Sequence, residues 1–197
     1  MPTSVTAQNF PRDFPLSIYV AASFKHKHGV RLLGRELTAL GCKILDWTEM
    51  AVPPPGLTPL ERRVWMDTDR DGGQVYAFCR DACLSADMVM YYGASGQDAG
   101  VEIGLAAGVG TPVLGIRGPL EAPGLMLHGA VNHWVDTVEE ALNITGLLVA
   151  HARTFWKNLD TESHIGVKRL AKRLILTRQT ELQGLLASKT SMCPDQV

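Results

Sequence analysis

The chain has 197 residues, of which 46% are hydrophobic and 20% are charged, and its formal net charge is −1. This length fits one domain of ordinary size with an appendage, and the composition is typical of a soluble globular protein. A net charge so close to zero argues against a general polyanion binder, so we expect no nucleic-acid partner.

The ends and the cysteines of the chain indicate its compartment. The first fifteen residues, MPTSVTAQNFPRDFP, have no apolar core and do not resemble a signal peptide. No uninterrupted apolar run is long enough to span a bilayer. The four cysteines show no paired metal-ligand spacing, which favours reduced core thiols. We therefore expect a cytoplasmic protein with no membrane partner and no metal.

Short apolar runs alternate along the chain with segments of helical periodicity. The pattern predicts strands at 16–23, 42–47, 87–93, 111–116 and 132–137. It predicts helices at 31–41, 58–68, 74–86, 98–108, 137–154 and about 161–187, with Gly41 ending the first of them. The basic run 25–30 and the proline-rich run 49–59 are expected to be loops.

This alternation favours an α/β fold. Strands that are apolar throughout fit a parallel sheet covered on both faces, and right-handed crossovers give a flavodoxin-like order of 2-1-3-4-5. We expect an N-terminal extension at 1–15, an α/β domain at 16–150 and a C-terminal helical extension at 151–197. Ligands of such folds bind beyond the carboxyl ends of the strands, here between the loops ASFKHKHG (22–29) and YGASGQDAG (92–100).

The helix predicted after the second of these loops contains an unusual carboxylate, Glu102, among small apolar residues. Asp98 is expected to be the N-cap of this helix, which places Glu102 in or just past the first turn, where the helix dipole favours a negative charge. Since the helix has few other polar side chains, we expect it to be buried on most of its surface. Gly100 and Gly104 weaken it, which makes sense if a ligand or backbone lies close.

The segments IYVAASF, SADMVMYY and GQDAGVEIGLAAGVGTPVLGI resemble the nucleoside 2-deoxyribosyltransferase superfamily, which also contains nucleoside 5′-monophosphate N-glycosidases. The resemblance covers about residues 16 to 136, and its most specific part is the aligned set Tyr19, Asp87 and Glu102. It implies that Glu102 is a nucleophile that attacks C1′ of the sugar and displaces the base, and that Tyr19 orients this carboxylate. It implies no cofactor. Without the resemblance, Tyr19 would be an ordinary strand aromatic.

The crevice loops and the resemblance together supply the candidates for contact with a nucleoside or nucleotide. They are Ser23, Phe24, Asp81, Gly93, Ser95, Gly96, Asp98 and Asn132. The family often has an aspartate eight residues before the position of Asp87, where it helps to protonate the leaving base, but Cys79 stands there in this chain. Asp81, or an aspartate of the segment 67–71 (Asp67, Asp69 and Asp71), is the alternative.

Two features of the sequence give opposite indications of whether the substrate carries a phosphate. Asp98 would repel one, whereas the basic run 25–28 could bind one. The balance slightly favours 2′-deoxynucleosides and transfer of deoxyribose to another base. The alternatives are a nucleoside monophosphate N-glycosidase and a non-catalytic nucleotide-binding module. The resemblance also implies a homo-oligomer, and the basic helix near 161–187 fits docking or oligomerisation.

Overall fold

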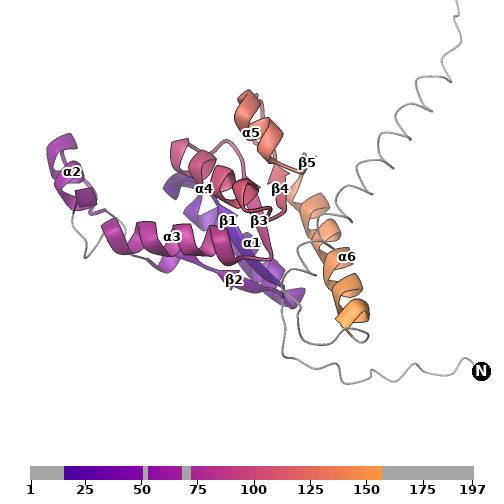
Figure 1. Cartoon of the computed structure of the whole chain (residues 1–197). Coiled ribbons are helices and arrows are strands. Elements are labelled where there is room, and N and C mark those ends of the chain that lie inside the picture. Colours follow the sequence, from indigo (N-terminus) through magenta and orange to yellow (C-terminus); the bar gives the residue numbers. More distant parts are fainter. Residues whose placement is uncertain (1–15, 51–52, 68–71, 157–197) are drawn as a thin grey trace, which may run out of the picture.

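The computed structural model describes residues 16–50, 53–67 and 72–156 (Figure 1). Its centre is a parallel sheet of five strands in the order β2-β1-β3-β4-β5, which confirms the predicted flavodoxin-like topology. The strands are β1 (Ser17–Ala21), β2 (Lys43–Leu45), β3 (Met88–Tyr92), β4 (Val113–Ile116) and β5 (His133–Val135). The winding reverses between β1 and β3, so the switch point lies where the sequence predicted it.

The central strands are buried on both faces, which explains their unbroken apolar sequence. Within β3, four consecutive side chains from Met88 to Tyr91 are fully buried. The register sets Tyr19 of β1 beside Val89 of β3, and Val89 beside Val113 of β4. Side chains alternate along each strand, so these three residues share one face of the sheet.

Apart from α2, the α-helices form two groups. α1 (Lys27–Ala39) packs against α6 (Val138–Trp156), while α4 (Gln97–Gly108) packs between α3 (Gln74–Ser85) and α5 (Leu125–Ala130). Figure 1 shows the two groups on opposite sides of the sheet. α4 also contacts β1, β3 and β4, so it lies across the switch point.

The beginning of α1 was predicted wrongly. The basic run expected as a loop forms a short 3-10 helix, η1 (Phe24–His26), and α1 starts directly afterwards at Lys27. The longer helix brings Val30 onto the sheet together with Leu33 and Leu37. Its other end follows the prediction, because Gly41 has a φ of 94° and its amide donates to the carbonyl of Thr38 at 2.9 Å.

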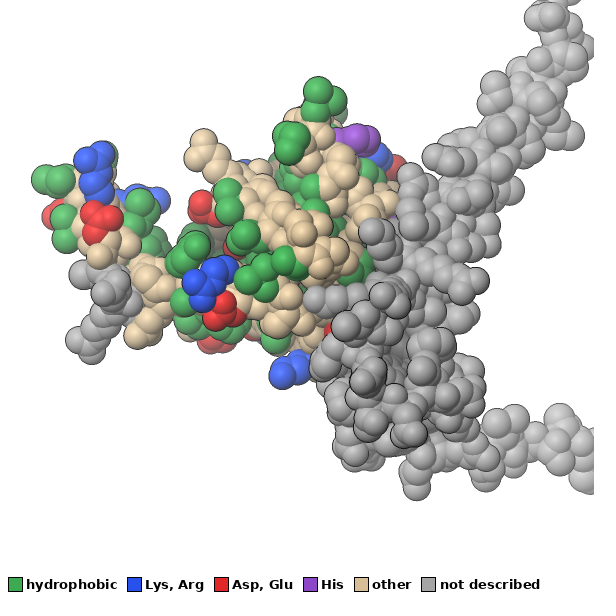
Figure 2. Space-filling view, viewed as in Figure 1, with side chains coloured by type: hydrophobic (Ala, Val, Ile, Leu, Met, Phe, Trp, Pro, Cys, Tyr) green, Lys and Arg blue, Asp and Glu red, His purple; other side chains and the backbone are tan. Residues whose placement is uncertain are grey.

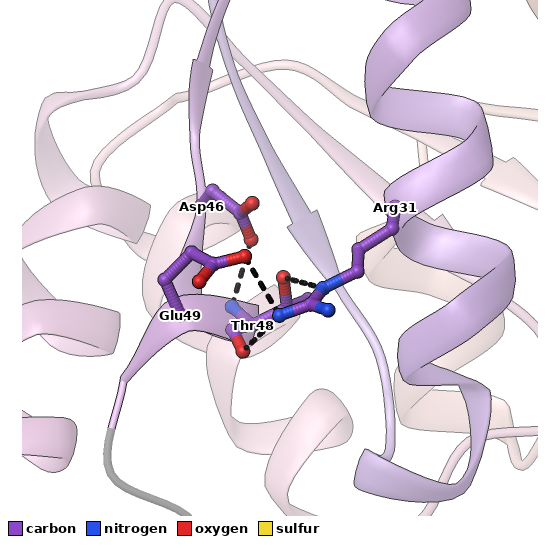
Figure 3. Close-up of polar contacts among 4 residues, drawn as sticks. All are labelled: Arg31, Asp46, Thr48 and Glu49. Atoms are coloured by element: carbon purple, nitrogen blue, oxygen red, sulfur yellow. Dashed lines mark hydrogen bonds and ion pairs between the residues drawn. The ribbon is translucent and has the colours of Figure 1, made fainter.

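A polar cluster ties α1 to the end of β2. The short helix η2 (Trp47–Glu49) follows β2, and Asp46 caps it by accepting from the amide of Thr48 at 2.7 Å. Arg31 of α1 donates to Thr48 Oγ1 at 2.9 Å and pairs with Glu49 at 2.7 Å (Figure 3). This contact fixes η2 at the carboxyl edge of the sheet. Neither η2 nor α5 was predicted, since each is too short to show a period.

α2 (Pro59–Asp67) stands apart from the sheet and has no buried residue (Figures 1 and 2). Local interactions at its start account for it. Thr58 and Glu61 form a capping box, in which Glu61 accepts from the Thr58 amide at 2.8 Å and the Glu61 amide donates to Thr58 Oγ1 at 3.3 Å. Pro59 suits the first helical position.

The two predicted extensions lie largely outside the described residues. This holds for segment 1–15 and for the helix expected at 161–187, so both stay predictions. None of the helices in the described part of the chain is long and apolar enough to cross a membrane.

Candidate active site

Tyr19 and Glu102 meet beneath the switch point. Tyr19 is the middle residue of β1, and Glu102 is the sixth residue of α4. The Tyr19 hydroxyl donates a hydrogen bond of 2.7 Å to Oε1 of Glu102. The tyrosine is completely buried, so the hydroxyl is held in place by the packing of its own ring. The structure thus contains the pairing that the family resemblance implied.

The second oxygen of Glu102, Oε2, is buried and accepts no hydrogen bond of ordinary geometry from the described residues. Burial raises the pKa of Glu102 to about 7, although polar interactions with Tyr19 and Cys79 lower it, and the charge of Asp98 raises it slightly further. The carboxyl group is therefore about half ionised near neutral pH. Buried polar atoms are usually hydrogen-bonded, so this oxygen marks Glu102 as a candidate functional group.

The expected cap of α4 was wrong. The helix begins at Gln97 with Gly96 as the N-cap, and Asp98 lies in the first turn rather than before it. Glu102 consequently lies beyond that turn, where the helix dipole is weak. Burial outweighs the dipole, which is why the pKa of Glu102 rises instead of staying low.

The burial of α4 was also overestimated. Ala99, Ile103 and Ala106 face the sheet, whereas Val101 and Val109 are more than half exposed. A Cβ atom added at any of the three helix glycines would meet no atom within 4 Å; these are Gly100, Gly104 and Gly108. Their surroundings are open, so no close approach by another described part of the chain accounts for these glycines, and a ligand lying close stays a prediction.

Cys79 of α3 completes the surroundings of the carboxylate. Its thiol is half-buried and interacts with both Tyr19 and Glu102. Burial raises the pKa of Cys79 to about 11, so the thiol keeps its proton at neutral pH. Cys83, one turn further along α3, is fully buried and also has a raised pKa, chiefly through burial. The position at which the family often has an acid is thus a protonated thiol beside Glu102.

Asp98 is exposed and lies one turn before Glu102 on the same side of α4. Its negative charge raises the pKa of both Glu102 and Cys79. Among the predicted residues, the structure therefore gathers Tyr19, Glu102 and Asp98 around one point, with Cys79 as a fourth member.

The loop between β3 and α4 is held by contacts within the protein. Gly93 is buried, and a Cβ atom there would collide with Glu121 and with the backbone of Gly118. The Ser95 hydroxyl donates to the carbonyl of Tyr92 at 2.5 Å and accepts from the Ser23 amide at 3.0 Å. Packing therefore accounts for Gly93 and Ser95 without a substrate.

The aromatic residues around the carboxyl edge divide into buried and exposed ones. Trp47 is buried and donates from Nε1 to the carbonyl of Val20 at 2.7 Å, so it belongs to the core. Phe24 packs its edge against Trp47 with 5.1 Å between ring centroids and is 39% exposed. Phe24 is thus an exposed aromatic side chain at this edge.

Two predicted contacts are not brought to this site. Asp81 is exposed, pairs with Arg80 at 2.7 Å and lies two positions from both Cys79 and Cys83, which places it on the other side of α3. Asn132 precedes β5 at the amino edge of the sheet, where its Oδ1 accepts from the Val113 amide at 2.8 Å. Its role is structural, because the site lies toward the carboxyl edge.

Asp87 is structural too. Its carboxylate accepts from the amide and the hydroxyl of Ser17, at 2.8 and 2.6 Å, and so joins the beginnings of β3 and β1. Asp67 is exposed at the end of α2, and the alternatives Asp69 and Asp71 lie outside the described residues. No predicted aspartate of the described residues therefore stands beside Glu102 from the α3 side.

Sequence reasoning missed Glu121. It follows β4 in the segment GPLEAPG, and its carboxylate accepts from the hydroxyl of Tyr91 and from the amide of Gly118. A glutamate within a run of glycine and proline shows no periodicity, so the sequence contained no signal for it. The carboxylate also acts on His26, whose pKa is lowered by burial and by Lys25 and raised by Glu121.

The described residues contain no group of three or more histidine, cysteine or acidic side chains that could hold a metal ion. The groups that meet at Glu102 are a carboxylate, a phenol and a thiol.

No family model and no curated protein matches the chain. Among solved structures it is similar to a 2-deoxyribosyltransferase from the psychrotolerant bacterium Bacillus psychrosaccharolyticus, at 19% identity and a TM-score of 0.47, over 64% of this chain and 90% of that one. It is also similar to a CMP N-glycosidase from Clostridium botulinum, at 16% identity and a TM-score of 0.42, over 64% and 96% of the two chains. Both likenesses are remote, so a function for this chain must rest on its own residues.

Proposed function

We propose that this chain cleaves the N-glycosidic bond of a 2′-deoxynucleoside and transfers the deoxyribosyl group to a second base. The observation that carries the proposal is the Tyr19–Glu102 pair. One oxygen of the carboxylate is held by a buried hydroxyl at 2.7 Å, and the other is buried and accepts no hydrogen bond of ordinary geometry from the described residues, although the Cys79 thiol interacts with the carboxylate. A carboxylate oriented in this way is suited to attack an anomeric carbon.

The reaction has two steps. In the first step, an oxygen of ionised Glu102 bonds to C1′ while the C1′–N bond breaks. The electron pair of the C1′–N bond leaves with the base, and the base takes up a proton. The product is a deoxyribosyl ester of Glu102. A nitrogen of the second base then attacks C1′, the ester bond returns its electron pair to the carboxylate, and the incoming base loses a proton. Water in place of that base gives hydrolysis.

Tyr19 and Cys79 have different roles in this scheme. The Tyr19 hydroxyl fixes Oε1 and favours the charged carboxylate, which must be present before attack and after release. Cys79 is half-buried beside the same carboxylate and holds a proton at neutral pH. It stands at the sequence position where the resembled family often has its base-side aspartate, and we place it at the base side of Glu102.

A substrate without a phosphate agrees best with the edge of the site. Asp98 adds a negative charge one turn from Glu102. The Ser95 hydroxyl already donates its hydrogen bond to the Tyr92 carbonyl. Asp98 would repel a dianionic phosphate, and the Ser95 hydroxyl would have no hydrogen bond left to donate to it. An uncharged 5′-hydroxyl could instead donate a hydrogen bond to Asp98.

One observation favours the second candidate, hydrolysis of a nucleoside 5′-monophosphate. Gly96 is exposed and caps α4 without a side chain, so the amides of the first turn are open to an anion. Lys25 is exposed on the neighbouring η1 and would add a positive charge. The two candidates share Glu102 and Tyr19 and differ in the 5′-group and in the acceptor.

A substrate panel separates them. The full chain is incubated with the four 2′-deoxynucleosides and with their 5′-monophosphates, each with and without a second free base, and products are separated by chromatography. We expect a new nucleoside with the unphosphorylated substrates. Free base from monophosphates alone would favour the second candidate. Mass spectrometry of quenched reactions should show one deoxyribosyl group on the peptide that contains Glu102.

Three variants serve as controls. Glu102→Ala and Glu102→Gln should abolish product, whereas Glu139→Gln, which removes the same charge from the exposed first turn of α6, should retain it. Full activity of Glu102→Gln would exclude the covalent mechanism. No product from any substrate with the unmodified chain would exclude both enzymes and leave the non-catalytic nucleotide-binding module.

A further inference from the structure

Glu121 joins two strands at the carboxyl edge of the sheet. Its Oε1 accepts a short hydrogen bond from the Tyr91 hydroxyl at the end of β3. Its Oε2 accepts from the amide of Gly118, just past β4, at 2.8 Å. Both oxygens of the carboxylate are therefore used, and neither partner belongs to the reaction scheme above.

The turn that carries Glu121 is strained. Leu120 has a φ of 61°, the left-handed region that a leucine rarely adopts, and its side chain is fully exposed. The Glu121 amide closes the turn by donating to the carbonyl of Gly118 at 3.0 Å. Leu120 gains no packing in return for the strain. The contacts of Glu121 are what hold the turn in this conformation.

The Tyr91 hydroxyl links Glu121 to the loop after β3 through a second hydrogen bond. Besides donating to Glu121, it accepts from the Ser95 amide at 3.1 Å. Ser95 Oγ in turn accepts from the Ser23 amide at 3.0 Å. The series Glu121, Tyr91, Ser95 and Ser23, named here the edge relay, links the loops that follow β4, β3 and β1.

The edge relay is joined through the backbone to the segments that carry Tyr19 and Glu102. Ser95 directly precedes Gly96, the N-cap of α4, and Glu102 lies six residues further along the same helix. Ser23 lies four residues beyond Tyr19 in the loop after β1. The close approach of Gly93 to Gly118 and Glu121 leaves no room for a side chain at Gly93, so the loops after β3 and β4 lie in direct contact. A substitution at Glu121 can therefore shift the positions of both Tyr19 and Glu102 through the backbone of the loops that precede or follow them.

We propose that Glu121 is a positioning residue: through Tyr91 and Ser95 it holds the start of α4 against the loop after β1, and so fixes Glu102 relative to Tyr19 and the bound sugar. The effect on catalysis rests on the proposed function, whereas the effect on the loops does not. Glu121 itself does not touch the reacting atoms. Its carboxylate is needed because a single group must accept from a phenol and from a backbone amide at once.

The test uses Glu121→Gln, Tyr91→Phe and the double variant, with Glu139→Gln as the charge-matched control. Glutamine keeps the shape but must present an NH₂ group to one of two donors, and phenylalanine keeps the buried ring while removing only the hydroxyl. Amide hydrogen exchange is measured by NMR, with the Val89 amide, bonded to Pro112 in the sheet, as the internal reference. kcat and KM are measured with the best substrate of the panel.

Both single variants should speed exchange at the Ser23 and Ser95 amides about tenfold, the effect of losing one hydrogen bond, while the Val89 amide is unchanged. Each should lower kcat about tenfold with a smaller change in KM. Because the residues act in series, the double variant should be no worse than the worse single variant.

Exchange at Ser23 and Ser95 in Glu121→Gln equal to that in Glu139→Gln would overturn the edge relay, and so would losses that multiply in the double variant. If the unmodified chain shows no cleavage of any substrate, the proposed function fails. The exchange rates alone then decide whether Glu121 holds the loops.

Discussion

The Tyr19 hydroxyl lies 2.7 Å from Oε1 of Glu102 and joins the middle of β1 to the second turn of α4. The same carboxylate has a pKa of about 7, because burial opposes its ionisation more strongly than the hydroxyl supports it. Changes in the surroundings of Glu102 should thus be visible at neutral pH, in activity and in stability.

The first prediction concerns pH and Tyr19. Attack requires ionised Glu102, so kcat/KM should rise with pH and reach half of its plateau near pH 7. Tyr19→Phe removes the hydrogen bond that lowers this pKa. The midpoint should then move to higher pH by about one to two units, the value of a hydrogen bond to a charged group. The measurement is the pH profile of kcat/KM for both proteins, and an unmoved midpoint in Tyr19→Phe would contradict the role of the hydroxyl.

The second prediction has the opposite sign. The negative charge of Asp98 raises the pKa of Glu102, so Asp98→Asn should shift the same midpoint to lower pH. The shift should be small and should shrink as salt is added, since Asp98 is exposed. If Asp98 also accepts from the sugar, KM rises at every pH. A salt-independent shift, or one in the same direction as Tyr19→Phe, would speak against this arrangement.

The third prediction links Glu102 to folding. Its folded-state pKa is raised above the unfolded value of about 4.3, so its contribution to stability is complete below that value and is lost as pH rises to about 7. Above pH 7 the buried charge costs on the order of 3 kcal/mol. Glu102→Gln should therefore be more stable than the unmodified chain at pH 8, with the difference vanishing near pH 4. Urea unfolding at both pH values measures it, and a difference that does not depend on pH would refute the assignment.

The fourth prediction tests the contact between Glu102 and Cys79 without a substrate. The raised pKa of Cys79, about 11, makes its alkylation by iodoacetamide slow at pH 8.5. Part of that shift comes from the charge of Glu102, so Glu102→Gln should speed alkylation of Cys79 about twofold to tenfold. Peptide mass spectrometry follows each cysteine separately. Equal rates at Cys79 in the two proteins would show that the two groups do not interact.

The topology was predictable because it depends on features that recur along the chain. Apolar β-branched runs and amphipathic segments alternate, and few ways exist to wind them into one right-handed sheet. The order of the strands and the switch point followed from that. The ends of the elements were harder to predict than their order. α1 starts at Lys27, four residues before the predicted start, because packing of Val30 on the sheet outweighs the polar character of the basic run.

Individual contacts were harder to predict. Asp98 is a favourable N-cap by residue type, yet the loop after β3 is pinned by Ser95, and Gly96 takes the cap position instead. Asn132 was assigned to the substrate through the family resemblance, but the direction of β5 places it at the amino edge. Local preference cannot decide such cases, since the position of a loop depends on the strands to which it is bonded.

The sequence by itself determined the parallel α/β sheet and the switch point, because periodicity acts locally, while the pairing of Tyr19 with Glu102 was implied only by the family resemblance. Only the tertiary structure decided that Glu102 has a pKa near neutrality, that Cys79 stands beside it, and that Glu121 is tied to the site through Tyr91. Desolvation and hydrogen bonding between distant segments exist only once the layers are packed, so no pattern along the chain records them.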